Sequence, residues 1–493
     1  MAGRPGEPES RDAQAAKSQD KEDGFMRKNQ GNIPRRQEDG SLGMLLLVWL
    51  YRLLLISTMA AGICLIGTLP VQVGSAEFVA VLIAYAMLLV VMQGVYRACA
   101  AGQARISELV MSQILANLVT LGMLFVGVAL YTHSLFNPLP LLGVLVGQIL
   151  LGCLWSVLAN RCYFRNRRPS RAAVIYSDEQ GLQKLIQTPY FQERYEVCKR
   201  IACDGQDIGT LREEVRGCEI LFTVGVPATL TNGIAKLCLE MDLEGYFIPH
   251  LGHIILAGAE YMSTFSVPML RVQRAGGHSE YRVIKRLFDF CASLVAVVVT
   301  LPIMAVTALA IWLEDRGPVL YRQVRLTKNG REFRILKFRS MNVNAEQDGI
   351  ARLAGENDIR ITKVGRFIRS CRIDELPQLF NILKGDMSIV GPRPERPEIA
   401  ELYQKELPEF ALRLQVKAGL TGLAQVYGRY STEPYNKLQM DLMYINEMSF
   451  LRDLQLMLMT VKILFMKESA RGVTRDQAAT RETSVPKETR LRA

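Results

Sequence analysis

Four long apolar runs constrain this fold more than any other feature of the sequence. They occupy residues 44–69, 77–96, 109–131 and 140–159. Each is close to the ~20 residues that a helix needs to cross a hydrocarbon core about 30 Å thick. The sequence therefore predicts a membrane protein whose residues 42–160 form four transmembrane helices. Arg52, inside the first run, is expected to face a neighbouring helix or to extend toward the membrane surface.

Basic residues around these runs predict their orientation. The loops 70–76 and 132–139 contain no Lys or Arg, whereas the other flanks are basic. Because Lys and Arg favour the cytoplasmic side of a membrane, both ends of the four-helix block are expected to face the cytoplasm. The basic residues are Arg27, Lys28, Arg35 and Arg36 before the first run, Arg97 and Arg105 between the second and third, and Arg161, Arg165, Arg167, Arg168 and Arg171 after the fourth.

The rest of the chain is more polar. With 22% charged residues, the mean hydropathy is still +0.12, so the apolar residues are concentrated in part of the chain. Residues 1–40 and 469–493 have too few large apolar side chains to offset the entropy of ordering and are predicted to be disordered tails. The 493 residues allow about three domains. Ten scattered cysteines without a CxxC pair argue against a disulfide scaffold or a structural zinc site and favour reduced thiols.

Residues 172–275 have the pattern of a cytoplasmic α/β domain. Strand-like runs at 172–176, 219–224 and 245–248 alternate with helical patterns, which is typical of a parallel sheet. A dinucleotide-binding fold would carry G-x-G-x-x-G after its first strand, but this chain has SDEQG at 177–181. We therefore expect a degenerate Rossmann-like domain with a structural or regulatory role.

A fifth apolar segment, 291–313, is long enough to span a membrane but is flanked by basic residues on both sides. This flanking conflicts with a simple crossing. Pro302 can kink or break a helix. The sequence favours a re-entrant helix-break-helix near 286–313 that dips into the cytoplasmic leaflet. The alternative, a fifth span, would place everything downstream outside the cytoplasm.

The following segment, 316–396, is strongly basic, with 17 Lys and Arg against 9 Asp and Glu. Such a cluster beside a membrane helix can hold anionic lipid head groups or phosphorylated substrates. A nucleic-acid surface is not expected because few aromatic residues are interleaved and because of the four spans.

An adjacent acid pair, Asp374 and Glu375, lies within this basic segment. Neighbouring Lys and Arg lower carboxylate pKa values, so we expect both groups to be ionised and suited to act as a nucleophile or as ligands of Mg²⁺. Downstream, GDMSIVGPRP at 385–394 predicts a rigid turn that presents Arg393 to a phosphate.

Several ordered motifs carry a family resemblance. KRLFD at 285–289, GPVLYRQ at 317–323, FRILKFRSM at 333–341, DELPQ at 374–378 and GDMSIVGPRP at 385–394 together resemble the bacterial polyprenyl-phosphate hexose-1-phosphate transferases, in their large monotopic phosphoglycosyl transferase form. The resemblance covers about 280–468 and implies an α+β catalytic domain on the re-entrant helix. These enzymes start exopolysaccharide, capsule or O-antigen assembly.

The resemblance implies a reaction and roles for individual residues. A hexose-1-phosphate would move from a UDP-hexose to undecaprenyl phosphate at the cytoplasmic face of the bacterial inner membrane, with release of UMP. Asp374 would form a covalent phospho-sugar intermediate, and Glu375, with Asp374, would bind Mg²⁺. Phosphate contacts are expected from Lys337, Arg339, Arg360, Arg366, Arg369 and Arg393. The re-entrant helix would include Lys285, Arg286, Asp289 and Pro302.

Two motifs depart from the family pattern. D-P-R-I-T reads DIRIT at 358–362, and K-P-G-[IM]-T-G-[WL] reads KAGLTGL at 417–423, so both lose a proline near the expected substrate site. The identity of the hexose and the glycan stays open, as does a homodimer formed through the spans or the α/β domain, for which the sequence has no motif. Two other functions stay open: a lipid-linked glycosyltransferase that releases UDP, and a non-catalytic membrane scaffold. Residues 438–466 predict amphipathic helices, either on the membrane surface or packed on the catalytic core.

Overall fold

The computed structural model describes residues 39–102, 104–166, 169–187, 191–264, 267–274, 279–342, 358, 360–428 and 433–464. The predicted tail at 469–493 lies outside these residues, as does the predicted tail at 1–40 except for its last two residues. Arg27, Lys28, Arg35, Arg36, Arg167 and Arg168 also lie outside the described residues.

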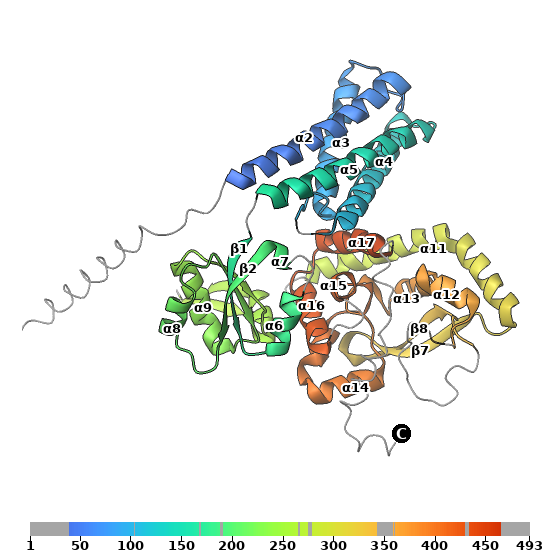
Figure 1. Cartoon of the computed structure of the whole chain (residues 1–493). Helices are drawn as coiled ribbons and strands as arrows, with labels where there is room; N and C mark the ends of the chain where they lie inside the picture. The colour runs from blue at the N-terminus through green and yellow to red at the C-terminus, as the bar shows by residue number, and fades with distance from the viewer. Residues whose placement is uncertain are drawn as a thin grey trace, which may run out of the picture.

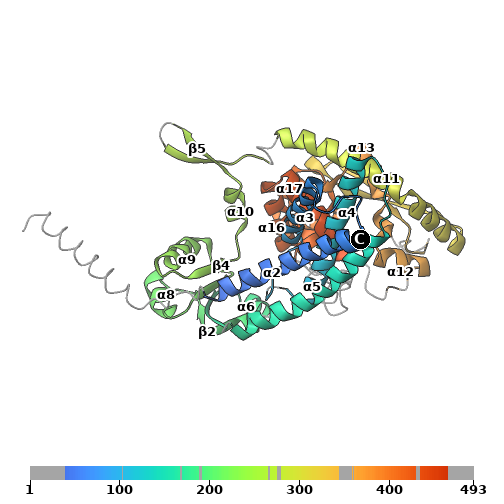
Figure 2. The ribbon, with the colours of Figure 1, turned by 90° about the horizontal axis from the view of Figure 1, so that it is seen from above.

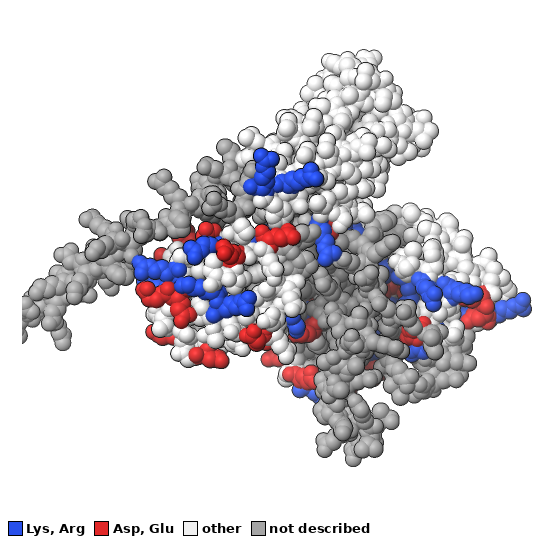
Figure 3. All heavy atoms as spheres, in the orientation of Figure 1, with Lys and Arg blue, Asp and Glu red and all other residues white. Residues whose placement is uncertain are grey.

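The four predicted apolar runs form four long helices (Figure 1): α2 (Asp39–Ala61), extended by η1 (Gly62–Ile66), α3 (Ala76–Val95), α4 (Ile106–Thr132) and α5 (Leu139–Asn166). Each is long and apolar enough to cross a membrane. We call them the helical block. Figure 3 shows that the end of this block farthest from the other domains is uncharged on the face drawn.

Large side chains fill the interior of the helical block. Tyr51 and Tyr85 are almost fully buried, and Tyr51 stacks on Trp155. Arg52 donates to the side-chain oxygen of Gln93 on α3. The prediction that Arg52 faces a neighbouring helix is therefore confirmed.

The middle domain is an α/β domain with a parallel sheet, as predicted. Its elements are β1 (Ser170–Tyr176), α6 (Glu179–Ile186), α7 (Phe191–Arg194), β2 (Tyr195–Ala202), α8 (Ile208–Glu214), β3 (Ile220–Val224), α9 (Ala228–Glu240) and β4 (Glu244–Phe247). The strand order is β2-β1-β3-β4, and apolar clusters cover both faces of the sheet, as expected for parallel strands between helices.

The loop after β1 closes on itself where a dinucleotide phosphate would bind in a Rossmann fold. The side chain of Asp178 accepts hydrogen bonds from the backbone nitrogens of Gln180 and Gly181, the donors that a phosphate would use. Ser177 donates to the carbonyl oxygen of Gly225 after β3. An acidic side chain therefore occupies the position of the missing glycine motif.

The chain then forms α10 (Leu251–Ala257) and an antiparallel hairpin of β5 (Glu260–Thr264) and β6 (Val267–Arg271), which projects from the molecule in Figure 2. Next comes α11 (Ser279–Asp315), one continuous helix that includes Pro302. The predicted helix break at Pro302 is wrong. Figure 1 shows a bent helix, because a proline removes one backbone hydrogen bond and the rest of the helix can continue on both sides. Since α11 is long and apolar enough to span, re-entry stays a prediction.

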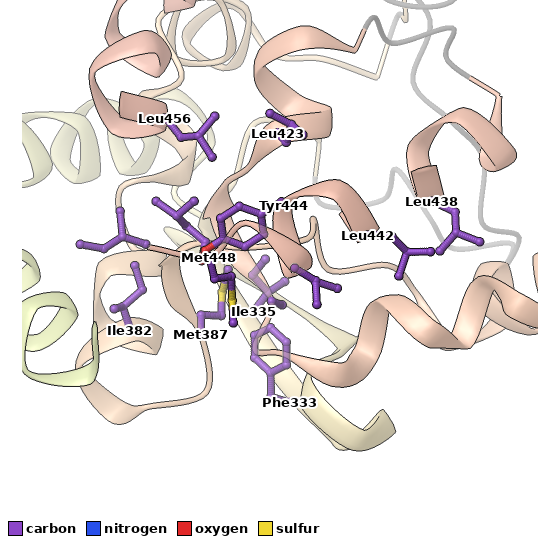
Figure 4. Close-up of a cluster of buried hydrophobic side chains, with 14 of the residues drawn as sticks. Phe333, Ile335, Ile382, Met387, Leu423, Leu438, Leu442, Tyr444, Met448 and Leu456 are labelled. Atoms are coloured by element: carbon purple, nitrogen blue, oxygen red, sulfur yellow. Dashed lines mark hydrogen bonds between the residues drawn. The ribbon is translucent and has the colours of Figure 1, made fainter. Parts of the chain in front are cut away.

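The C-terminal domain packs on one side of α11. It contains β7 (Leu320–Leu326), η2 (Lys328–Gly330), β8 (Glu332–Phe338), α12 (Lys363–Ser370), η3 (Ile373–Glu375), α13 (Gln378–Lys384), β9 (Ser388–Val390), α14 (Pro397–Glu406), η4 (Pro408–Gln415), β10 (Gly419–Thr421), α15 (Leu423–Tyr427), α16 (Pro434–Asn446) and α17 (Phe450–Leu464). Its packing on α11 involves α12, α13 and β9. Figure 4 shows the core of the domain, in which Phe333, Ile335, Ile382, Met387 and Tyr444 converge.

Among the described residues, two packed helix contacts join this domain to the rest of the chain. In the first, α10 packs on α16, and Asn446 donates to the carbonyl oxygen of Ile254 over 2.6 Å. In the second, α17 packs on α3 and α4, where Met459 joins a buried cluster with Met92 and Leu115. Both helices of 438–466 therefore pack on other parts of the protein, in line with one of the two alternatives left open by the sequence.

Candidate active site

The acid pair lies in a tight turn between two helices. After α12, Arg372 adopts a left-handed conformation (φ 57°), which few residues other than glycine adopt readily. The chain then makes the single 3-10 turn η3, which holds Asp374 and Glu375, and continues into α13. Pro377 precedes α13 directly, a position where its missing N–H costs nothing.

Glu375 lies at the centre of three cations from different parts of the chain. Its Oε1 is 2.9 Å from Lys337 Nζ on β8 and 3.1 Å from Arg393 Nη2 after β9. Arg372 Nη1 is 3.8 Å away. Burial alone would raise the pKa of Glu375, but these three charges hold it well below its usual range. The predicted ionised state of Glu375 is confirmed.

Asp374 has the opposite electrostatic surroundings. Burial, followed by the negative charge of Glu375, raises the pKa of Asp374, although Lys337, Arg369 and Arg372 act against this shift. Nearby bases lower the pKa of Asp374 as predicted, but burial and the charge of Glu375 outweigh them, so the expectation of a lowered pKa fails for Asp374. Asp374 Oδ1 is buried and, among the described residues, has no hydrogen-bond partner. A carboxylate oxygen without a partner can attack an electrophile when the group is ionised.

The predicted phosphate-binding residues separate into two groups. Lys337 and Arg393 contact Glu375, and Arg369 acts on Asp374. The other three have different surroundings. Arg339 forms an ion pair with Asp315, and Arg360 pairs with Asp358 at 2.6 Å. Arg366 is exposed on α12. Arg393 keeps 37% of its side-chain surface exposed, so it can also reach a bound anion.

Lys285, Arg286, Asp289 and Pro302 all lie in α11, and the first three also join this helix to the C-terminal domain. Lys285 pairs with Asp453 on α17. Asp289 accepts a hydrogen bond from Ser388 Oγ over 2.7 Å and another from the backbone nitrogen of Ile389 over 3.2 Å. The start of α11 therefore positions β9, and through β9 the turn that carries Arg393.

Arg413 stabilises the turn that carries Arg393. The sequence motifs did not identify it as a site residue. Its Nη2 donates to the carbonyl oxygen of Arg393 over 2.9 Å and lies 2.7 Å from Asp441 Oδ2 on α16. Its guanidinium lies over the ring of Phe410 at 4.8 Å. These partners are far apart in the sequence, so no local signal could have identified them. Arg372 was missed as well, although its position beside the acid pair is a signal.

The donor types in this site suit Mg²⁺. Among the described residues, no three His, Cys, Asp or Glu side chains are placed to hold a metal ion together. Mg²⁺ is commonly held by one or two carboxylates together with substrate phosphate oxygens. Asp374, with its unpartnered buried Oδ1, and the ionised Glu375 fit such a site.

Comparisons with known proteins identify the family. The profile of the bacterial sugar transferase family matches residues 280–467. A UDP-glucose:undecaprenyl-phosphate glucose-1-phosphate transferase of Caulobacter vibrioides is 42% identical over 191 residues, which are 38% of this chain and 71% of that protein. The chain belongs to the bacterial sugar transferase family. The family segment begins at the first turn of α11 and includes every side chain described above around the acid pair.

Two further relatives match this bacterial sugar transferase over a segment of similar length. A UDP-N-acetylgalactosamine-undecaprenyl-phosphate N-acetylgalactosaminephosphotransferase of Aeromonas hydrophila is 42% identical over 194 residues, 39% of this chain. A UDP-glucose:undecaprenyl-phosphate glucose-1-phosphate transferase of Klebsiella pneumoniae is 42% identical over 193 residues, 38% of this chain. The chain spans 46% and 41% of the lengths of these two relatives.

Proposed function

We propose that this protein transfers a hexose-1-phosphate from a UDP-hexose to undecaprenyl phosphate, with release of UMP. Asp374 would be the nucleophile. The observation that carries the proposal is its buried, unpartnered Oδ1 beside a carboxylate that three cations hold ionised. The names of the relatives support the donor and acceptor classes. The reaction would start the assembly of an exopolysaccharide, capsule or O-antigen.

Two successive displacements at one phosphorus atom account for the reaction. In the first, an oxygen of Asp374 attacks the phosphorus that bears the hexose, and the bond to the UMP oxygen breaks, so UMP leaves with the electron pair. In the second, a phosphate oxygen of undecaprenyl phosphate attacks the same phosphorus and releases the Asp374 carboxylate. Covalent catalysis of this kind divides one difficult transfer into two easier steps.

The neighbouring residues would serve the transfer through charge. Lys337 and Arg393 both contact Glu375 on one oxygen, and their positive charges would offset negative charge on a phosphate bound beside it. Arg369, whose charge acts on Asp374, would favour ionised Asp374 before the attack. Mg²⁺ bound by Glu375 and Asp374 would offset negative charge on the phosphates.

The test is a nucleotide-release assay on the full chain in lipid nanodiscs with Mg²⁺, undecaprenyl phosphate and a panel of UDP-sugars, each tested separately. UMP release with one sugar, lost in Asp374→Asn, is the expected result. Asp204→Asn makes the same chemical change at an exposed position of the middle domain and should keep full release. A donor labelled in its sugar should leave label on the protein when the acceptor is omitted, and Asp374→Asn should take up none.

Other outcomes would assign a different function. UDP release would indicate a lipid-linked glycosyltransferase. Absence of nucleotide release from the whole panel, with a folded protein, would favour a scaffold. UMP release that persists in Asp374→Asn would refute the nucleophile.

We also propose that α11 re-enters the cytoplasmic leaflet and that the acid pair faces the cytoplasm. Basic residues flank the apolar part of α11 on both sides, which disfavours a crossing. In a chain free of other cysteines, single cysteines at the exposed Arg282 and Arg316 should both react with a membrane-impermeant thiol reagent from the cytoplasmic side. Labelling from opposite sides would show a fifth span instead.

A further inference from the structure

A group of basic side chains lies at the end of α13 that is remote from the acid pair. We call Arg286, Lys328, Arg331 and Lys417 the basic cluster. Charge interactions join Lys417 to the other three members. With 7 residues and a rise of 1.5 Å per residue, α13 places about 10 Å of helix between Asp374 and Gly385, so an anion at this cluster does not contact the acid pair.

Glycine at position 385 leaves the approach to this cluster open. A Cβ at Gly385 would lie 3.2 Å from Arg286 Nη2 and 3.8 Å from Lys417 Nζ, so both cations line the same space. Arg286 donates to the carbonyl oxygens of Ile382 and Leu383. These bonds fix the guanidinium at the last turn of α13 and leave other N–H groups for a ligand.

The acidic side chains near the basic cluster do not neutralise its four positive charges. Asp386 is 2.9 Å from Arg331 but also 3.6 Å from Lys384, and the buried Asp289 already accepts hydrogen bonds from β9. Lys417 forms no ion pair with a described residue. Burial, followed by the charges of Arg286 and its neighbours, lowers the pKa of Lys417. An anion bound here would remove this unfavourable repulsion.

An apolar groove continues from the cluster along α11. It is shallow and open to solvent, and it is lined by Arg282, Val283, Arg286, Leu287 and Phe290, all on α11. Val283 and Leu287 are 72% and 66% exposed, and Phe290 is 43% exposed. Arg286 belongs to both the groove and the basic cluster, so a site for an anion and an exposed apolar surface adjoin each other.

We propose that the basic cluster and this groove bind an anionic phospholipid, with its phosphate between Arg286 and Lys417 and its acyl chain along α11. Charge complementarity identifies the head group, and the exposed apolar side chains of α11 identify the chain. A soluble phosphate would use the cluster but would leave the groove empty. This site is distinct from the acid pair, and the inference does not rest on the proposed function.

The test measures lipid binding to the full chain by native mass spectrometry in a neutral detergent. Phosphatidylglycerol, phosphatidylcholine and inorganic phosphate are titrated separately. The protein is expected to bind phosphatidylglycerol at least about tenfold more tightly than phosphatidylcholine, because a charge-assisted hydrogen bond contributes roughly this much. Lys417→Gln should lose about tenfold in affinity for phosphatidylglycerol, whereas Lys236→Gln, on the exposed face of α9, should lose nothing.

A second variant covers the case in which Lys417→Gln does not fold. Arg282→Gln changes an exposed residue of the groove and should also lower the affinity for phosphatidylglycerol. Equal binding of both lipids, or unchanged binding in the variants, would overturn the proposal. Binding of inorganic phosphate as tight as that of phosphatidylglycerol would also overturn it, in favour of a site for free anions.

Discussion

Removal of either partner of the Arg413–Asp441 ion pair should destabilise the C-terminal domain strongly. The two side chains are only 4% and 2% exposed, and Nη2 and Oδ2 are 2.7 Å apart. Loss of one member of such a buried pair leaves an uncompensated charge and typically costs about 3–5 kcal/mol. Arg413→Met and Asp441→Leu are therefore expected to be severe changes, whereas the double variant replaces both charges with apolar groups and should be more stable than Arg413→Met.

The surroundings of the pair predict which single change costs more. Arg413 also lies 3.6 Å from Glu395, so Asp441→Leu leaves the arginine one acid partner. Arg413→Met leaves both Asp441 and Glu395 without a cation and also removes the donor to the Arg393 carbonyl. We expect about 3 kcal/mol for Asp441→Leu and about 5 kcal/mol for Arg413→Met.

Hydrogen exchange of the amides of α16 is a suitable assay, since it reports local opening free energies in a protein whose global unfolding is not two-state. If the two single changes had equal effects, and the double variant showed their sum, the pair would not be coupled and the reasoning would be refuted. UMP release should fall in Arg413→Met, because the turn that carries Arg393 loses its support.

Asp441 also predicts a dependence of stability on pH. Burial outweighs the attraction of Arg413 and raises the pKa of Asp441 from 3.8 to about 6. The folded state therefore binds a proton between about pH 4 and pH 6 that the unfolded state has released, so this residue makes stability fall as pH rises through that window, by roughly 3 kcal/mol. Above pH 6 both states are ionised and the contribution is constant. In Asp441→Asn, α16 should show a smaller fall in stability from pH 4 to pH 6 than the unchanged protein, as measured by its hydrogen exchange. An equal fall in both would contradict this assignment.

Three further changes test other parts of the structure. Lys337→Met removes a cation that lowers the pKa of both Glu375 and Asp374, so both pKa values should rise and the acidic limb of UMP release should move to higher pH. Gly365→Ala would place a Cβ 2.0 Å from the carbonyl oxygen of Ser340, and should lower the free energy of local unfolding by about 1–3 kcal/mol, measured by hydrogen exchange of α12. Asn117→Leu removes a fully buried amide whose two polar atoms have no partner among the described residues, so it should raise the thermal midpoint of the helical block.

Control substitutions at positions without these contacts test whether the predicted changes in stability and pH profile are specific. Gly127→Ala lies on α4, where an added Cβ meets nothing within 4 Å, and should be neutral or slightly stabilising. Lys236→Gln should leave the pH profile of UMP release unchanged. A drop in the thermal midpoint of Asn117→Leu would show that its amide is satisfied in the membrane by a ligand or by water.

The sequence predicted the structure best where a single local feature determines it. Long apolar runs predict helices because the membrane leaves few other structures, and the acid pair with Arg393 lies in short motifs that fold locally. The sequence failed where distant residues compete. The pKa of Asp374 depends first on its burial and then on the charge of Glu375, and this burial is set by parts of the chain that are distant in the sequence. Pro302 was expected to break a helix, yet α11 continues through it with a bend (Figure 1), because a proline removes only one backbone hydrogen bond.

The contact between Ile254 and α16 shows that the family segment is not self-contained. Ile254 lies before residue 280 but is a member of the main buried cluster of the C-terminal domain, and Asn446 caps the carbonyl oxygen of Ile254. A protein cut at residue 280 would expose this part of α16 to water. Exchange of the C-terminal domain between relatives, in evolution or by design, would therefore have to move α10 with it or change the apolar surface that α10 covers.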